Sequence, residues 1–147
     1  MIKPTELRIG NLVYAINRSG PVHIPELPAF KIVTLGLFKA EILLPELNPA
    51  NIAELPKKHY SDLSPILLTE EILLKAGCIK GHKKNFYWRE HLLFEVFNVT
   101  ALENGEKFIA GRLSKNAIIA VSKEIKYVHQ LQNIHFSLTE TELQINL

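Results

Sequence analysis

Basic side chains flank a run of three aromatic residues in the segment KGHKKNFYWREH, residues 80–91, and these residue types could do recognition chemistry. Lysine and arginine neutralise phosphate, and aromatic rings stack on nucleobases, as in proteins that bind single-stranded nucleic acid. The same groups would suit an anionic small ligand. The candidate ligand-binding residues of this segment are Lys80, Lys83, Lys84, Tyr87, Trp88 and Arg89. The alternative is that the lysines solvate a loop and the aromatic residues begin a core strand, because Phe86 and Trp88 share parity with Leu92.

A second polar set occurs in KYVHQLQNIHFSLT, residues 126–139. Apolar residues recur there at helical spacing, which predicts a helix over residues 126–138 with its apolar stripe against a core. Amide side chains on the opposite arc can both donate and accept hydrogen bonds, so they suit a polar ligand or a partner's backbone. The candidate residues of this arc are His129, Gln132, Asn133 and Phe136. The alternative is that another part of the same domain covers this face.

Signatures of catalysis are absent from the sequence. The seven glycines form neither GxGxxG nor a phosphate-binding loop, and there is no GxSxG elbow. The six histidines form no HExxH motif, and the single cysteine excludes CxxC. We therefore expect a non-enzymatic protein with no cofactor and no metal.

Composition narrows the class of protein further. The chain has 147 residues, 47% of them hydrophobic and 22% charged, which predicts one globular domain over residues 1–147. The formal net charge of +2 neither favours nor excludes a nucleic-acid partner. We expect the opening MIKPTELRIG not to be a signal peptide, because no apolar run follows its lysine, and no apolar run in the sequence is long enough to span a membrane. With one cysteine and no such segment, we expect a cytoplasmic protein without a membrane partner.

The clearest local signal is LLTEEILLKAGC, which predicts a helix over residues 69–76. Thr69 is a good N-cap, and two glutamates in the first turn suit the helix dipole. Leu68 and Leu73 have the spacing of a hydrophobic staple. Gly77 suits the left-handed position after the helix, which places Cys78 where it packs back on Leu73 as a small buried residue.

The remaining elements are predicted to be strands and loops. Seven of the eight prolines lie between Pro21 and Pro65, so we expect an irregular, proline-rich excursion at about residues 45–65. Strands are predicted at residues 12–16, 30–38, 107–113 and 117–122, with a hairpin over 86–97 that turns at 89–91 and a terminal strand through 143–146.

Together these elements predict an α+β fold. We expect a curved, mostly antiparallel sheet of about five to seven strands covered by the two helices. An SH3-like half-barrel is one form that the opening strands could take.

Three blocks, ELRIGN, PILLTEEILLKAG and KYVHQLQNIHFSLTETEL, resemble a family of small proteins from phages, prophages and mobile elements of Bacteroidota whose members have no assigned activity. Members often carry glycine after the Leu-Thr pair of the last block, where this chain has Glu140. The resemblance implies a phage or mobile-element source, and hence the host cytoplasm as the place of action.

The resemblance implies a binding role by association, since small accessory proteins without catalytic motifs commonly bind something. The first hypothesis is an anti-defence type of protein that binds and blocks or sequesters a host factor, either a host protein or an anionic signalling nucleotide. The second is a nucleic-acid-binding module that uses residues 80–91. The third is a structural or assembly protein of a virion or a homo-oligomer, with a patch such as the Phe136 face buried between chains.

Overall fold

The computed structural model describes residues 2–15, 29–37, 39–43, 56–81, 86–91, 94–102, 107–114 and 117–147. Their contacts divide the chain into two compact units, Met1–Ile66 and Leu67–Leu147, which we call unit 1 and unit 2. The α+β prediction is confirmed, but two antiparallel sheets form where one was predicted. All strand pairs of each sheet lie within one unit, and most join strands that are neighbours in sequence, whereas β1 pairs with the distant β5.

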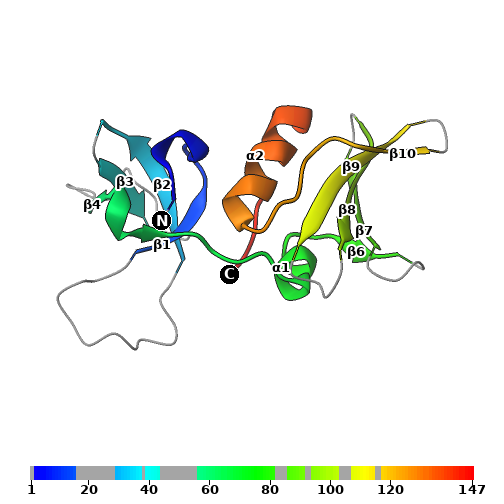
Figure 1. Cartoon of the computed structure of the whole chain (residues 1–147), viewed down its shortest axis with the longest axis horizontal. Helices are drawn as coiled ribbons and strands as arrows, with labels where there is room; N and C mark the ends of the chain where they lie inside the picture. The colour runs from blue at the N-terminus through cyan, green and yellow to red at the C-terminus, as the bar shows by residue number, and fades with distance from the viewer. Residues whose placement is uncertain are drawn as a thin grey trace. The chain divides into compact units, whose positions relative to one another are not determined.

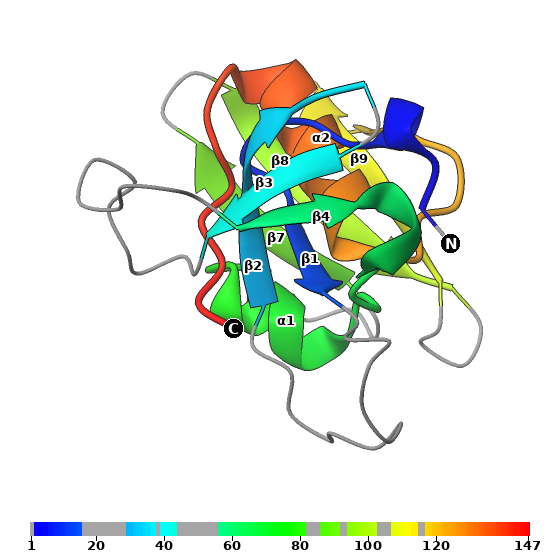
Figure 2. The same ribbon diagram turned by 90° about the vertical axis from the view of Figure 1, so that its left-hand side faces the viewer.

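Unit 1 is an antiparallel sheet with two short 3₁₀ turns (Figure 1). Its strands are ordered β4-β3-β2-β1-β5, and the run of β2, β3 and β4 can be followed in Figure 2. Residues 45–55 of the predicted excursion lie outside the described residues, whereas its later part forms regular elements, which corrects the prediction there. The elements of unit 1 are η1 (Pro4–Glu6), β1 (Leu12–Ala15), β2 (Ala29–Leu35), β3 (Lys39–Leu43), β4 (Lys57–His59), η3 (Tyr60–Asp62) and β5 (Leu63–Ser64).

A tight turn at Gly10 leads into β1. Gly10 has a φ of 93°, which favours glycine, and its N–H donates to the Ile32 carbonyl at 2.8 Å. The fully buried Asn11 accepts from the Arg8 N–H through Oδ1 at 2.8 Å, and its carbonyl accepts from the Ile32 N–H at 2.9 Å. The ELRIGN block therefore closes its own turn and joins it to β2.

Alternation along β3 separates the core of unit 1 from its outer face. Ala40 and Ile42 are buried with Ile32 in one apolar cluster. Lys39 and Glu41 have the opposite parity and pair with His59 and Lys57 of β4. The outer face of the β2–β3–β4 region is therefore polar and accessible.

Unit 2 holds the second sheet, ordered β10-β9-β8-β7-β6, and both α-helices (Figure 1). Its elements are α1 (Glu70–Lys75), β6 (Ile79–Lys80), β7 (Phe86–His91), β8 (Phe94–Ala101), β9 (Phe108–Ser114), β10 (Ala117–Ala120) and α2 (Val128–Thr139). The turn predicted at residues 89–91 is wrong, because these residues continue β7 to the pairing of His91 with Phe94.

Helix α1 follows the sequence prediction closely. Thr69 caps it by accepting from the Ile72 N–H through its hydroxyl oxygen at 3.3 Å. Gly77 is left-handed with a φ of 80°. The N–H groups of Gly77 and Cys78 donate to the carbonyls of Leu74 and Leu73, which completes a Schellman motif. Cys78 is buried there, as predicted.

Helix α2 ends where the chain turns back. Glu140 takes the left-handed conformation, with φ 56° and ψ 14°, and its N–H donates to the Phe136 carbonyl at 2.7 Å. The residues after it are not a strand, so the predicted terminal strand is wrong. Leu143 and Ile145 are nevertheless buried while Gln144 is exposed. The alternation of apolar and polar residues here thus indicates which side chains face inward, but it does not indicate that the backbone pairs with another strand.

Replacing Glu140 with glycine should stabilise the protein. A left-handed conformation costs an L-residue about 1–2 kcal/mol, and glycine removes this strain. Because glycine also has more conformational freedom in the unfolded state, the net gain in stability is smaller than the strain removed. We expect Glu140→Gly to raise the free energy of unfolding by about 0.5–1 kcal/mol in urea denaturation. Glu142→Gly, which has no positive φ, should instead destabilise. A loss of stability in Glu140→Gly would contradict the cap.

Candidate functional site

The two residues of the 80–91 segment whose side chains are described are engaged inside unit 2. Lys80 Nζ lies 2.6 Å from Glu70 Oε1 and 6.0 Å from the centroid of the Tyr87 ring. Tyr87 is only 2% exposed, which corrects its predicted role, since a buried ring offers no open face to a base. Lys80 remains half-exposed and still carries its charge.

The Glu70, Lys80 and Tyr87 side chains shift one another's protonation. The hydrogen bond from Lys80, followed by that from Tyr87, lowers the pKa of Glu70 below its ordinary value. The same bond to Glu70 raises the pKa of Lys80. Burial, followed by the hydrogen bond to Glu70, raises the pKa of Tyr87. The cluster holds β6 and β7 to the start of α1 and is structural in character.

The other members of the basic and aromatic set are not placed. Lys83 and Lys84 lie outside the described residues. Trp88 and Arg89 belong to β7, and their side chains are not described. Their ligand-binding role therefore stays a prediction.

The predicted recognition face of α2 is largely inside the protein. His129 is fully buried and Gln132 is 2% exposed, while Asn133 and Phe136 are half-buried. Compared with the apolar stripe predicted from the sequence, the buried face of α2 is rotated about the helix axis toward the polar side, by somewhat less than one residue step of about 100°. The prediction of an open ligand-binding arc is therefore wrong at His129 and Gln132.

Hydrogen bonds from the C-terminal segment explain how Gln132 and His135 of α2 tolerate burial. Gln132 Nε2 approaches the Leu143 carbonyl at 3.5 Å. His135 Nδ1 lies 3.1 Å from the Thr141 carbonyl and 3.2 Å from the Thr139 hydroxyl. Periodicity counts apolar residues and does not register that the chain itself supplies these partners. Most of the segment 126–143 therefore has a structural role within unit 2.

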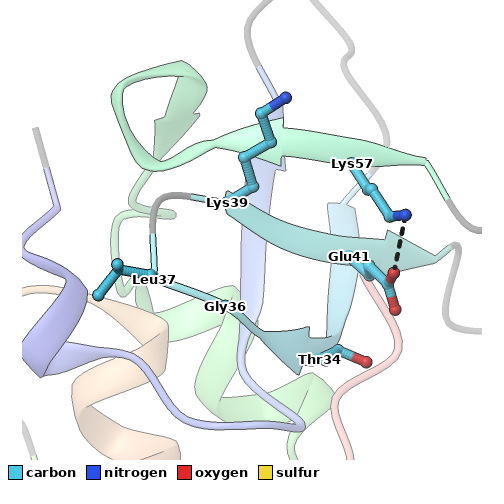
Figure 3. A pocket seen from close by; sticks show the side chains of 6 residues that line it. All are labelled: Thr34, Gly36, Leu37, Lys39, Glu41 and Lys57. Atoms are coloured by element: carbon cyan, nitrogen blue, oxygen red, sulfur yellow. Dashed lines mark ion pairs between the residues drawn. The ribbon is translucent and has the colours of Figure 1, made fainter.

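A pocket lies instead on the outer face of unit 1 (Figure 3). Its volume is about 280 Å³. We call it the outer-face pocket, and it is lined by Thr34, Gly36, Leu37, Lys39, Glu41 and Lys57. Polar, cationic and apolar groups therefore meet in one hollow that three neighbouring strands and one turn create.

Charge in the outer-face pocket is partly compensated. Lys57 Nζ pairs with Glu41 Oε1 at 3.6 Å, and Figure 3 shows these two side chains reaching toward each other across neighbouring strands. Lys39 extends from the same face of β3, toward β4. Two ammonium groups and one carboxylate leave a net positive pocket, and the hydroxyl of Thr34 adds a neutral hydrogen-bonding group beside them.

The turn between β2 and β3 gives the pocket its shape. The Gly36 N–H donates to the Lys39 carbonyl at 2.9 Å, and the Gly36 carbonyl accepts from the Tyr60 hydroxyl at 2.7 Å. A Cβ at Gly36 would lie only 3.1 Å from the Lys39 carbonyl oxygen, so the turn leaves little room for a side chain. Tyr60 is buried, and its hydroxyl thus fixes the turn to η3.

Sequence reasoning missed this pocket entirely. The alternation of Lys39, Ala40, Glu41 and Ile42 is a strand signal that indicates two outward charges. The partner strand β4 follows a proline-rich segment, however, and nothing local shows that Lys57 returns beside Glu41. Only the pairing of strands distant in sequence creates the hollow.

Comparisons with protein-family models, with curated protein sequences and with solved structures found no match. Within the described part of the chain, no three His, Cys, Asp or Glu side chains form a group that could hold a metal ion. No helix in that part is long and apolar enough to cross a membrane. The site must therefore be interpreted from its own residues.

Removing the Tyr60 hydroxyl should loosen the pocket turn. We expect Tyr60→Phe to lower the free energy of unfolding by about 0.5–1.5 kcal/mol, because the Gly36 carbonyl loses a partly buried donor. Urea denaturation would measure this. Tyr14→Phe is the matched control, since its hydroxyl has no hydrogen bond among the described residues. Equal stability of wild type and Tyr60→Phe would contradict the role of this bond.

Tyr87 should titrate above the ordinary tyrosine pKa of 10.0. Because the folded-state pKa is raised, its contribution to stability is complete below pH 10 and is lost as pH rises through the folded-state value. Glu70→Gln should lower the pKa of Tyr87 without restoring the ordinary value, since burial persists. The difference between the ultraviolet pH titrations of wild type and Tyr87→Phe isolates this group. An unshifted Tyr87 titration would contradict its burial.

Proposed function

We propose that this protein is a non-enzymatic binding protein whose outer-face pocket holds the anionic group of a ligand. The observation that carries the proposal is that Lys39, Lys57 and Thr34 all line one hollow of the unit 1 sheet. Ammonium and hydroxyl groups donate hydrogen bonds, and the excess of one positive charge favours an anion. The lining residues include neither histidine nor cysteine, and Glu41 is held in an ion pair with Lys57, which supports binding rather than catalysis.

Pocket size supports a small anionic group rather than a long polymer. A hollow of about 280 Å³ is at the lower end for small-ligand sites, which suits one phosphate or carboxylate with part of the molecule that carries it. Its exposed Leu37 offers an apolar contact for that remainder. An anionic signalling nucleotide and an acidic side chain of a host protein share this chemistry.

We propose further that unit 1 is an SH3-like half-barrel. The strand order β4-β3-β2-β1-β5 supports this, as does the 3₁₀ turn η3 between β4 and β5. Such barrels serve as small binding modules in many unrelated proteins, so the analogy agrees with a binding role without specifying a ligand.

The biological role that we propose is that of a phage or mobile-element accessory protein that blocks or sequesters a host factor. Its support is the resemblance of three sequence blocks to small proteins of phages and mobile elements. A protein that only sequesters its target needs affinity and abundance but no catalytic group, which agrees with the residues that line the pocket.

Nuclear magnetic resonance titration would test the pocket. The probes are inorganic phosphate, as the smallest anion, and a set of cyclic nucleotides. We expect backbone shifts at Thr34, Gly36 and Lys39 with at least one nucleotide. Lys39→Gln should weaken binding about two- to fivefold, as expected for one exposed charge. Glu41→Gln should strengthen binding, because it releases Lys57 and removes a repelling carboxylate.

Lys58→Gln is the matched control for net charge. Lys58 lies on the same strand but pairs with the buried Ala40, so it has the opposite parity to the pocket residues. It should leave affinity unchanged apart from a small long-range effect. An equal loss of affinity in Lys58→Gln and Lys39→Gln would show that the net charge of the protein, and not the pocket, causes the effect. The absence of shifts with every probe would refute an anion pocket.

A further inference from the structure

The two sheets end in edge strands of opposite character. In unit 1, β4 is an end strand made of Lys57, Lys58 and His59, and lysines on an edge discourage pairing with another chain. In unit 2, β10 is an end strand, and the sequence from 117 to 121 reads AIIAV, without a charge or a proline. Ile119 is 44% exposed there. Within its own residues, this second edge therefore lacks the charges and prolines that protect other edges.

Backbone pairing shows which groups of β10 point outward. The Val121 N–H donates to the Ala110 carbonyl at 2.9 Å, in register with the pairing of Ala120 and Gly111. Because residues of an antiparallel ladder alternate in hydrogen-bonding direction, Ile119 points its N–H and C=O toward β9. Ile118 and Ala120 then point theirs away from the sheet. Each presents one donor and one acceptor at the edge.

We propose that β10 pairs antiparallel with β10 of a second copy of this chain. A two-fold axis at Ile119 would place Ile118 opposite Ala120 of the second copy, and the reverse. The two outward residues of each copy would then exchange four N–H···O=C bonds, and Ile119 would face its own equivalent in a non-hydrogen-bonded pair, where side chains approach most closely. The unit 2 sheets of the two copies would then form one continuous sheet.

A second copy fits this edge because the segment is compatible with itself. No charged residue faces a like charge within residues 117–121, and the exposed isoleucine meets an equal apolar surface. The nearest charges along the sequence, on Lys115 and Lys123, flank this segment, and since they would face each other between the two copies they limit the pairing to residues 117–121. An interface of this size is small, so we expect a dissociation constant on the order of 0.1–1 mM. This inference is independent of the outer-face pocket, which lies in unit 1.

Charge reversal at Ile119 would test the proposal. Ile119→Lys and Ile119→Glu each place like charges opposite one another across the axis, so each should weaken self-association at least about tenfold in sedimentation equilibrium. A mixture of the two variants should associate again as a one-to-one heterodimer, because the opposed charges then attract. Restored association also shows that both variants fold. Ile9→Lys, at another exposed isoleucine, should leave association unchanged.

Hydrogen exchange of the wild-type protein gives a second measurement. Exchange at the Ile118 and Ala120 amides should slow as protein concentration rises, while the amides turned toward β9 should show no such dependence. Ala120→Pro, which removes only an outward donor, should abolish the effect. A wild type that remains at 16.7 kDa up to about 1 mM would overturn the proposal, as would unchanged association in both charge variants.

Discussion

Main-chain hydrogen bonding across two antiparallel sheets is the interaction on which the rest of the structure depends. Within each sheet, neighbouring strands satisfy one another's N–H and C=O groups, and their pairing sets which side chains face the core. The ladder must stop at edge strands, where half of these groups have no partner in the sheet. The β4 edge carries lysines, and the β10 edge carries alanine and isoleucine. The same constraint therefore leads to a protected, cationic edge in one unit and to an unprotected, apolar edge in the other.

Left-handed residues determine where several elements begin or end. Gly10 and Gly77 occupy positive φ at turns that only glycine enters without strain, and both lie in blocks with strong local signals. Glu140 occupies the same region at the end of α2. The chain accepts the strain because the Glu140 N–H satisfies a helix carbonyl and the following segment returns over α2. Backbone conformation is thus maintained there by tertiary contacts rather than by residue type.

Polar residues serve opposite purposes in the two units. In α2, His135 and Gln132 are inside the protein because carbonyls of the C-terminal segment meet them. On the outer face of unit 1, Lys39, Glu41 and Lys57 remain in water, where one ion pair leaves an excess positive charge. Desolvation explains the difference, since an amide or imidazole needs only a hydrogen-bond partner to be buried, whereas an ammonium group needs a counter-charge. The most conspicuous polar sequence is therefore structural, and a less conspicuous one lines the pocket.

The sequence alone determined the local features: the capped α1 with its Schellman end, the presence of α2, the strands β9 and β10, and the α+β class. These features depend on residues a few positions apart, whose propensities and hydrogen bonds act within one turn or one strand. The tertiary structure alone decided that the strands form two sheets, that His129 and Gln132 are buried, and that Lys57 returns beside Glu41. Each of these depends on segments distant in sequence that share a face or an edge, and periodicity carries no information about which segment will supply the partner.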